Sequence, residues 1–257
     1  MKAAGIIVLA VIPLLFACLP KKPEIILPEA PAEPLVKALE ARRASFSGLR
    51  AVASVEAIRS GRRRAYDTVG IVIDGERRLR LEAFSPLGQS LVVLAWNGKD
   101  LLLRLEDGRL VRPGTEGLEK ILGVALDAGE LCALLSANLP QATYSEAKAY
   151  REPNGGSLLD LREGDGLLRR IWLGPPDAGS GDVRIETMEL RRAGKILYQA
   201  RYEEMEHISG YLVPKTVRIE NPDKNSSLAV EFHDTDVNVP LGDELFTLPG
   251  GGAQPHE

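Results

Sequence analysis

Residues 69–88 read VGIVIDGERRLRLEAFSPLG, and this stretch decides the fold class. Apolar residues stand at alternate positions on both sides of the turn dipeptide Asp74-Gly75. They are Val69, Ile71 and Ile73 before the turn, and Leu79, Leu81 and Ala83 after it. A period of two gives each segment one apolar face, which predicts two half-buried β-strands. Asp-Gly between two such runs is a strong hairpin signal, so we expect the two strands to pair antiparallel.

The same pattern extends outward in both directions. Further turn dipeptides are Ser60-Gly61, Asn97-Gly98 and Asp107-Gly108, and strand periodicity resumes after Pro140. Near Thr187 the apolar positions change face, which indicates a bulge or a strong bend. We expect roughly ten to twelve strands, too many for a flat open sheet. The sequence therefore predicts a mainly β fold, with some α, around a strongly curved antiparallel sheet or a barrel.

Helical spacing replaces strand spacing in two places. A helix is expected from about Leu35 to Ser45, with Pro34 at its first turn. Two short helices are expected between Thr115 and Asn138, where Asp127 and Glu130 have the spacing of a capping box. These two helices carry apolar stripes that need a surface to cover. Their apolar residues are Leu118, Ile121 and Leu122 in the first, and Leu131, Leu134 and Leu135 in the second.

The amino terminus predicts a cleaved signal and a lipid anchor. Lys2 gives a basic start, and residues 3–19 carry no charge. Because Pro13 interrupts this run, and because a spanning helix needs about 20 apolar residues, a secretory signal peptide fits better than a membrane span. The run ends in Ala17-Cys18, which resembles the lipobox of bacterial lipoproteins, whose cysteine is acylated and becomes the first mature residue. The alternative is an ordinary signal peptide with an incidental cysteine.

Four segments follow from these features. Residues 1–17 are the expected signal peptide, and residues 18–34 are the lipidated Cys18 with a tether. Five prolines in residues 19–34 favour extended polyproline II, at about 3.1 Å per residue. Residues 35–248 are the expected folded domain, and residues 249–257 a flexible tail.

Composition excludes several classes of function. The net charge of −4, from 32 basic and 36 acidic residues, lacks the basic excess of duplex-binding proteins. Aromatic residues make up only 5% of the chain, which argues against base-stacking or sugar-binding surfaces. We therefore expect no nucleic-acid partner.

The sequence also offers no catalytic or metal-binding constellation. The three histidines lack companions at metal-ligand spacing, and no nucleophile elbow or phosphate-binding loop occurs. Asp234-Thr235-Asp236-Val237-Asn238 imitates the start of a calcium loop, but the positions for its glycine and its last glutamate hold other residues, so a strand-end turn is favoured. Cys132 stands among leucines, which predicts a buried, inert thiol. We expect a protein that is not an enzyme and has no cofactor.

The order of these features resembles the LolB family of outer-membrane lipoprotein receptors, which are relatives of the periplasmic carrier LolA. The most specific match is Ser85-Pro86-Leu87-Gly88, which is similar to the Pro-Leu-Gly loop of that family. Glu119 to Gly123, and Leu131 to Pro140, follow the family's order of two lid helices and a closing Leu-Pro. The similarity is clearest from about Leu35 to Pro140 and only architectural beyond it.

The resemblance implies a fold, a function and partners. The fold is an unclosed half-barrel, and Pro86, Leu87 and Gly88 form a loop that inserts into the membrane. The lid over an acyl-chain cavity consists of Leu118, Ile121, Leu122, Leu131, Leu134 and Leu135. The implied partners are the acyl chains of lipoproteins, a LolA-like periplasmic carrier and the membrane that holds Cys18. Leu19 is not the Asp that retains enterobacterial lipoproteins at the inner membrane, so we expect the protein on the periplasmic face of the outer membrane. We also expect a monomer.

Three alternatives stay open at this level. The same fold can serve as a protein-binding platform of a structural or assembly lipoprotein, without lipid transfer. At the loop, Pro86 presets a bend that points Leu87 outward, but Leu87 can also fold over a neighbouring strand. We interpret the triplet Arg62-Arg63-Arg64 as a solvent-exposed rim around a hairpin. The alternative is that it contacts an anionic lipid head group.

Overall fold

A single antiparallel sheet of 14 strands organises the chain. The computed structural model describes residues 27–113, 117–124, 126–176 and 182–248. The first seven strands are β1 (Glu29–Ala30), β2 (Leu49–Arg59), β3 (Arg62–Asp74), β4 (Arg78–Phe84), β5 (Ser90–Trp96), β6 (Leu101–Arg104) and β7 (Leu110–Val111). The other seven are β8 (Tyr144–Arg151), β9 (Ser157–Glu163), β10 (Leu167–Leu173), β11 (Ile185–Arg192), β12 (Lys195–Ile208), β13 (Tyr211–Asn221) and β14 (Ser226–Val237).

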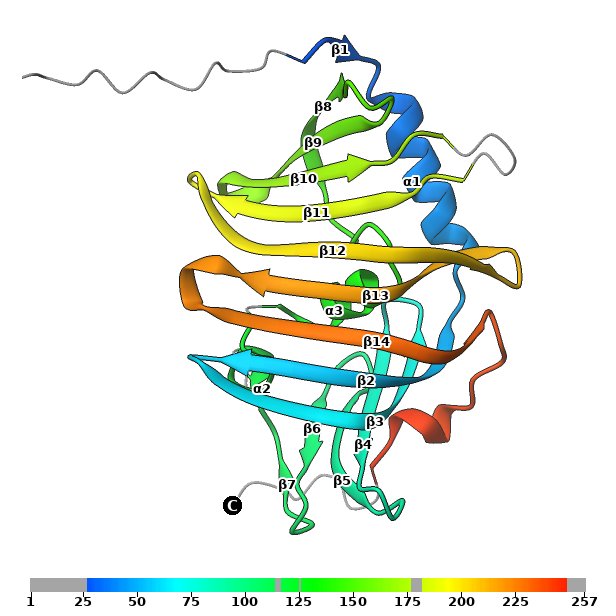
Figure 1. The fold of residues 1–257 in the computed structure, drawn as a ribbon, viewed down its shortest axis with the longest axis vertical. Coiled ribbons are helices and arrows are strands. Elements are labelled where there is room, and N and C mark those ends of the chain that lie inside the picture. The colour runs from blue at the N-terminus through cyan, green and yellow to red at the C-terminus, as the bar shows by residue number, and fades with distance from the viewer. Residues whose placement is uncertain (1–26, 114–116, 125, 177–181, 249–257) are drawn as a thin grey trace, which may run out of the picture.

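The sheet is curved and not closed. Its strand order is β1-β8-β9-β10-β11-β12-β13-β14-β2-β3-β4-β5-β6-β7, so pairing of β14 with β2 joins two consecutive meanders. Figure 1 shows β9 to β14, β2 and β3 lying roughly horizontally, one below the other, whereas β4 to β7 run roughly vertically. The expected mainly β, unclosed half-barrel is confirmed, with 53% of the described residues in strands.

The hairpin predicted from residues 69–88 is present in the expected register. Ile71 lies opposite Leu81, and Ile73 opposite Leu79. All four predicted turns connect consecutive strands, and the change of face near Thr187 coincides with a shift in register between β10 and β11. At Ser60-Gly61 both residues have positive φ, 48° and 76°, as in a type I′ turn.

Two features of the sheet differ from the expectation. The strand number exceeds ten to twelve partly because β1 and β7 have two residues each, too few to produce a periodic pattern. In addition, Glu29–Ala30 pairs with Tyr150 and Ala149 of β8, so these residues belong to the sheet and not to an extended tether. The signal peptide, Cys18, residues 19–26, Thr115 and the tail at 249–257 lie outside the described residues.

Three α-helices and three 3₁₀ turns complete the described part of the fold. The helices are α1 (Glu33–Ser45), α2 (Gly117–Leu122) and α3 (Ala128–Leu135), and the 3₁₀ turns are Gly164–Gly166, Pro222–Lys224 and Asp243–Phe246. α1 has proline in its first turn, as expected. Its buried Arg42 donates hydrogen bonds to the carbonyl oxygens of Ser136, Ala137 and Leu212, at 3.4, 3.0 and 2.6 Å. This guanidinium therefore ties α1 to the end of α3 and to β13.

Candidate functional site

An apolar cavity of about 590 Å³ lies between one half of the sheet and α2. Its wall comes from β2 to β6, the residue after β6 and α2, and is mainly aliphatic. Its apolar lining residues are Val55, Ala57, Tyr66, Val69, Leu81, Ala83, Val92, Leu94, Leu103, Leu105, Ile121 and Leu122. Pockets for drug-sized ligands span about 300–1,000 Å³, so this cavity has room for a small apolar molecule or one extended hydrocarbon chain.

The alternation of the strands builds this wall. Across β2 and β3, Val55 lies opposite Tyr66, and Ala57 lies opposite Arg64, so these side chains share the cavity face. Glu56 and its partner Ala65 take the other face. Leu81, Ala83 and the alternating residues of β5 continue the surface. The apolar side chains of the hairpin in residues 69–88 are therefore divided between the main core and the cavity wall.

Helix α2 covers the cavity. Ile121 and Leu122 line it, whereas Leu118 is buried but does not. Gly123 ends the helix with φ +82°, and a Cβ there would stand 3.1 Å from the carbonyl oxygen of Ile58. Only glycine allows this approach of α2 to β2. Arg59 donates to the carbonyl oxygen of Lys120.

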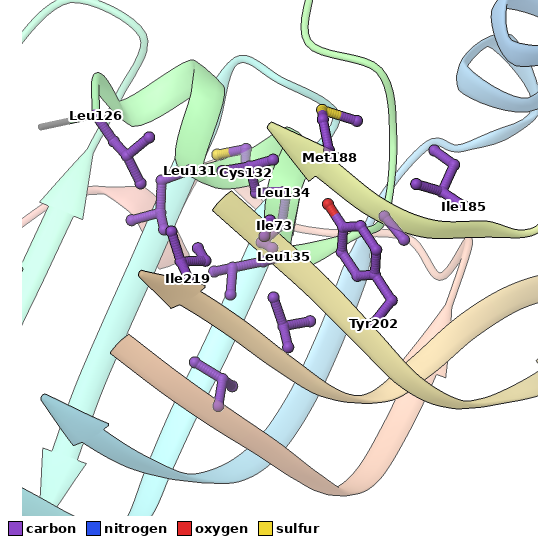
Figure 2. Close-up of a cluster of buried hydrophobic side chains, with 14 of the residues drawn as sticks. Ile73, Leu126, Leu131, Cys132, Leu134, Leu135, Ile185, Met188, Tyr202 and Ile219 are labelled. Carbon is purple, nitrogen blue, oxygen red and sulfur yellow. The ribbon is translucent and has the colours of Figure 1, made fainter. Parts of the chain in front are cut away.

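Helix α3 fills the other half of the concave face and does not line the cavity. Leu131, Leu134 and Leu135 are at most 1% exposed and pack in the main core. Figure 2 shows them converging with Ile73 and Ile219, which come from β3 and β13. Of the six residues expected to form a lid, the structure thus places only Ile121 and Leu122 at the cavity. The four others are core residues.

A buried polar network holds α3 against the sheet. Arg169 of β10, 3% exposed, donates to Glu163 at 2.5 Å, to Glu130 of α3 at 3.1 Å and to the Tyr198 hydroxyl at 2.5 Å. Tyr198 in turn donates to Glu130 at 2.5 Å. Asp127 caps α3 as expected, accepting from the Glu130 amide at 2.7 Å, but the Glu130 carboxylate serves this network. Our sequence reasoning missed Arg169, although its spacing of two from Ile171 and Leu173 places it on the core face.

The network perturbs the groups within it. Burial raises the pKa of the Glu130 carboxyl against the opposing effect of the Arg169 guanidinium. Burial also disfavours the charge of Arg169, but Tyr198 and the carboxylates of Glu163 and Glu130 outweigh that effect, and the pKa of Arg169 is raised. The guanidinium therefore stays charged and compensates two buried carboxylates.

The loop between β4 and β5 presents Leu87 to solvent. The Leu87 side chain is 87% exposed, so it does not fold over a neighbouring strand. Ser85 holds the loop: its hydroxyl accepts from the amides of Leu87 and Gln89 at 3.3 and 3.1 Å, and its carbonyl accepts from the Gly88 amide at 2.9 Å. Gly88 has φ +78°, which glycine adopts without strain. A large apolar side chain therefore stands on an ordered turn.

Cys132 and the segment 234–238 have the structural surroundings expected from the sequence. Cys132 is fully buried, and burial raises the pKa of its thiol far above the ordinary range, as expected of an inert cysteine. Asp236 pairs with Arg50 at 2.6 Å, and Asn238 accepts from the Ser47 amide, so this segment is a strand end. In the described part of the chain, no three His, Cys, Asp or Glu residues are grouped as metal ligands. Among the same residues, no helix has the length and apolar character to cross a membrane.

Solved structures share this fold at low sequence identity. A DUF1329 family protein from Desulfovibrio piger matches with a TM-score of 0.57 and 11% identity, over 84% of this chain and 97% of that one. An outer membrane lipoprotein-sorting protein domain from Vibrio parahaemolyticus matches with a TM-score of 0.57 and 12% identity, over 84% and 97%. A LolA superfamily protein from Nitrosomonas europaea matches with 0.55 and 16%, over 85% and 98%. No protein-family model and no curated protein matches the chain.

Proposed function

We propose that this chain is a LolB-like lipoprotein of the outer membrane that binds acyl chains. In this role it accepts lipoproteins from a LolA-like periplasmic carrier and inserts them into the membrane, without catalysis and as a monomer. The observation that carries the proposal is the apolar cavity under α2. Two structures with the same fold are described as lipoprotein-sorting and LolA superfamily proteins, which supports the assignment.

Physical chemistry makes transfer feasible without a catalytic group. Each methylene that leaves water for an apolar wall contributes about 0.8 kcal/mol, so the cavity can hold a chain by burial alone. An acyl chain gains about the same free energy in the membrane interior as in the cavity, so its exchange between the cavity and the membrane needs no ATP. The exposed Leu87 gives the molecule an apolar contact with the membrane, and the acylated Cys18 would keep it there.

Filling the cavity tests the proposal. Ala57 lines the cavity from β2, and Ala57→Phe should reduce the affinity for a fluorescent fatty acid at least about tenfold, because the ring occupies space that the chain needs. The matched control is Ala65→Phe, which adds the same ring to an exposed position on the other face of the hairpin. Equal binding by the two variants would contradict an acyl-chain site in this cavity.

A second function is favoured by one observation. Leu110 and Val111 of β7 are 37% and 39% exposed, and β7 is the last strand of the sheet among the described residues. Such an edge can take up a strand of another protein, as expected of a binding platform. Native mass spectrometry of the chain from Leu19 onward, which keeps every described element, separates the two functions. A lipid-transfer protein should carry co-purified acyl-chain ligands, whereas a platform should not.

A further inference from the structure

We propose that the cavity takes an amphiphile with an anionic head group, whose phosphate or carboxylate binds Arg62 and Arg64 at the cavity mouth. This inference rests on the proposed acyl-chain cavity and narrows the class of ligand. The polarity of the cavity wall changes along the β2–β3 hairpin. Val55, Ala57 and Tyr66 line the inner part, and Arg59, Arg62 and Arg64 line the part next to the Ser60-Gly61 turn.

Strand geometry directs these arginines to one side. Arg59 lies directly opposite Arg62, and Arg64 opposite Ala57, so all three guanidinium groups share the cavity face. Arg63 takes the other face and donates to Glu56 at 2.6 Å. Like charges directly opposite each other on a sheet are destabilising, so the Arg59–Arg62 pair costs stability unless an anion lies between them.

The acidic partners of other surface arginines are missing here. Within the described residues, no carboxylate pairs with Arg62 or Arg64, whereas Arg50 and Arg63 on the outer face of the same hairpin each have one. Arg59 uses one N–H on the carbonyl oxygen of Lys120. The mouth therefore holds guanidinium groups with donors available to a ligand.

A polar pocket of about 550 Å³ adjoins the mouth. It shares Arg59, Ser60 and Lys120 with the apolar cavity, and it also contains Lys224. Glu119, the one carboxylate among the described residues that line it, pairs with Lys224. Figure 1 shows the β2–β3 turn beside α2 at this end of the molecule. An apolar hollow that continues into a basic pocket matches an amphiphile with its chain inside and its head group at the turn.

Guanidinium chemistry specifies the sign and the type of head group. The planar fork of arginine binds carboxylate and phosphate oxygens through two parallel hydrogen bonds, which are stronger than neutral ones. The chain as a whole carries a net charge of −4, so this positive region is local and directs anions to the mouth. A neutral head group gains none of this interaction, and a cationic one is repelled.

Binding of single-chain probes tests the inference. Hexadecyl phosphate, palmitate and monopalmitoylglycerol have the same chain length and differ in the head group, so isothermal titration compares phosphate, carboxylate and neutral heads. The full-length protein should bind both anions about tenfold more tightly than the neutral glyceride at low salt. This preference should shrink at high salt because screening weakens exposed charge pairs. Tighter binding of hexadecyl phosphate than of palmitate would indicate a phospholipid as the natural ligand. Tighter binding of palmitate would indicate a fatty acid.

The double variant Arg62→Gln/Arg64→Gln should lose the preference for anions and keep the affinity for the glyceride. The matched control Arg50→Gln/Arg63→Gln removes two arginines from the outer face of the same hairpin and should keep the preference. Equal affinity of the unmodified protein for anionic and neutral probes, or an unchanged preference in the mouth variant, would overturn this inference alone. Failure to bind any of the three probes would overturn the acyl-chain cavity as well.

Discussion

Replacing Arg169 with methionine is expected to lower the free energy of unfolding by about 3–5 kcal/mol at neutral pH. The side chains of Arg169, Glu163 and Glu130 are 3%, 9% and 15% exposed, so the two carboxylates depend on this guanidinium for compensation. Methionine has a suitable shape but no charge, and it leaves both carboxylates unpaired in the interior. The variant should also release α3, whose Glu130 is joined to the sheet through Arg169 and Tyr198.

The cost of this substitution should depend on pH. Burial already raises the folded-state pKa of Glu130, and removal of Arg169 raises it further. A carboxyl with a raised folded-state pKa carries a penalty that is complete above that pKa and absent below the unfolded value of about 4.3. The difference between Arg169→Met and the unmodified protein should therefore shrink as the pH falls toward that value. Urea unfolding at a series of pH values measures it.

The neighbouring arginine provides a control. Arg170 points to the other face of β10, where it pairs with Asp160 at 2.8 Å and is 28% exposed. Arg170→Met should cost less than Arg169→Met, on the order of 1–2 kcal/mol, because it leaves one part-buried carboxylate, Asp160, without its partner and not two. Adding Glu130→Gln and Glu163→Gln to Arg169→Met should recover part of the loss by removing the buried charges. Equal losses for the two methionine variants would contradict a buried ionic anchor under α3.

The strands could be predicted from the sequence because their signals are local. The alternation in residues 69–88 and the four turn dipeptides depend only on neighbours, and all of them form the expected hairpins. Pairing of β14 with β2, which joins the two meanders, brings together segments more than half the chain apart. No local pattern specifies such a partner, so the strand order needed the structure.

The cavity could be located only in part. Both short helices have apolar stripes, and a stripe alone does not distinguish a helix over a cavity from one inside the core. α3 is apolar around most of its circumference, and Ala128, Cys132 and Ala133 are buried together with its leucines. That all-round apolar character is the sequence signal that distinguishes a buried helix from one that covers a cavity. Arg62 and Arg64 were visible as a charge cluster, but only the register across from Arg59 and Ala57 assigns them to the cavity face.

Leu87→Glu is expected to reduce insertion of a fluorescent lipoprotein into liposomes at least about tenfold, while the protein still folds. Inserting the leucine side chain into hydrocarbon contributes on the order of 1.5–3 kcal/mol, and about 1.4 kcal/mol corresponds to a factor of ten. A carboxylate at this position removes that gain and adds the cost of taking a charge out of water. Stability should change by no more than about 0.5 kcal/mol, because Leu87 is 87% exposed and makes no core contact.

Two control variants separate a specific loop function from a general effect of charge. Leu87→Met keeps an apolar side chain on the same turn and should retain transfer. Val52→Glu places the same charge at another exposed apolar residue, 41% exposed on β2, and should also retain transfer.

Ser85 holds the backbone of the turn, so the substitution at position 87 alters the side chain and leaves the conformation of the turn intact. The Leu87→Glu variant should therefore still bind a fatty acid in the cavity, and its defect should lie in delivery to the membrane. Unchanged insertion by Leu87→Glu would refute this role of the loop, whereas an equal defect in Val52→Glu would assign the effect to charge.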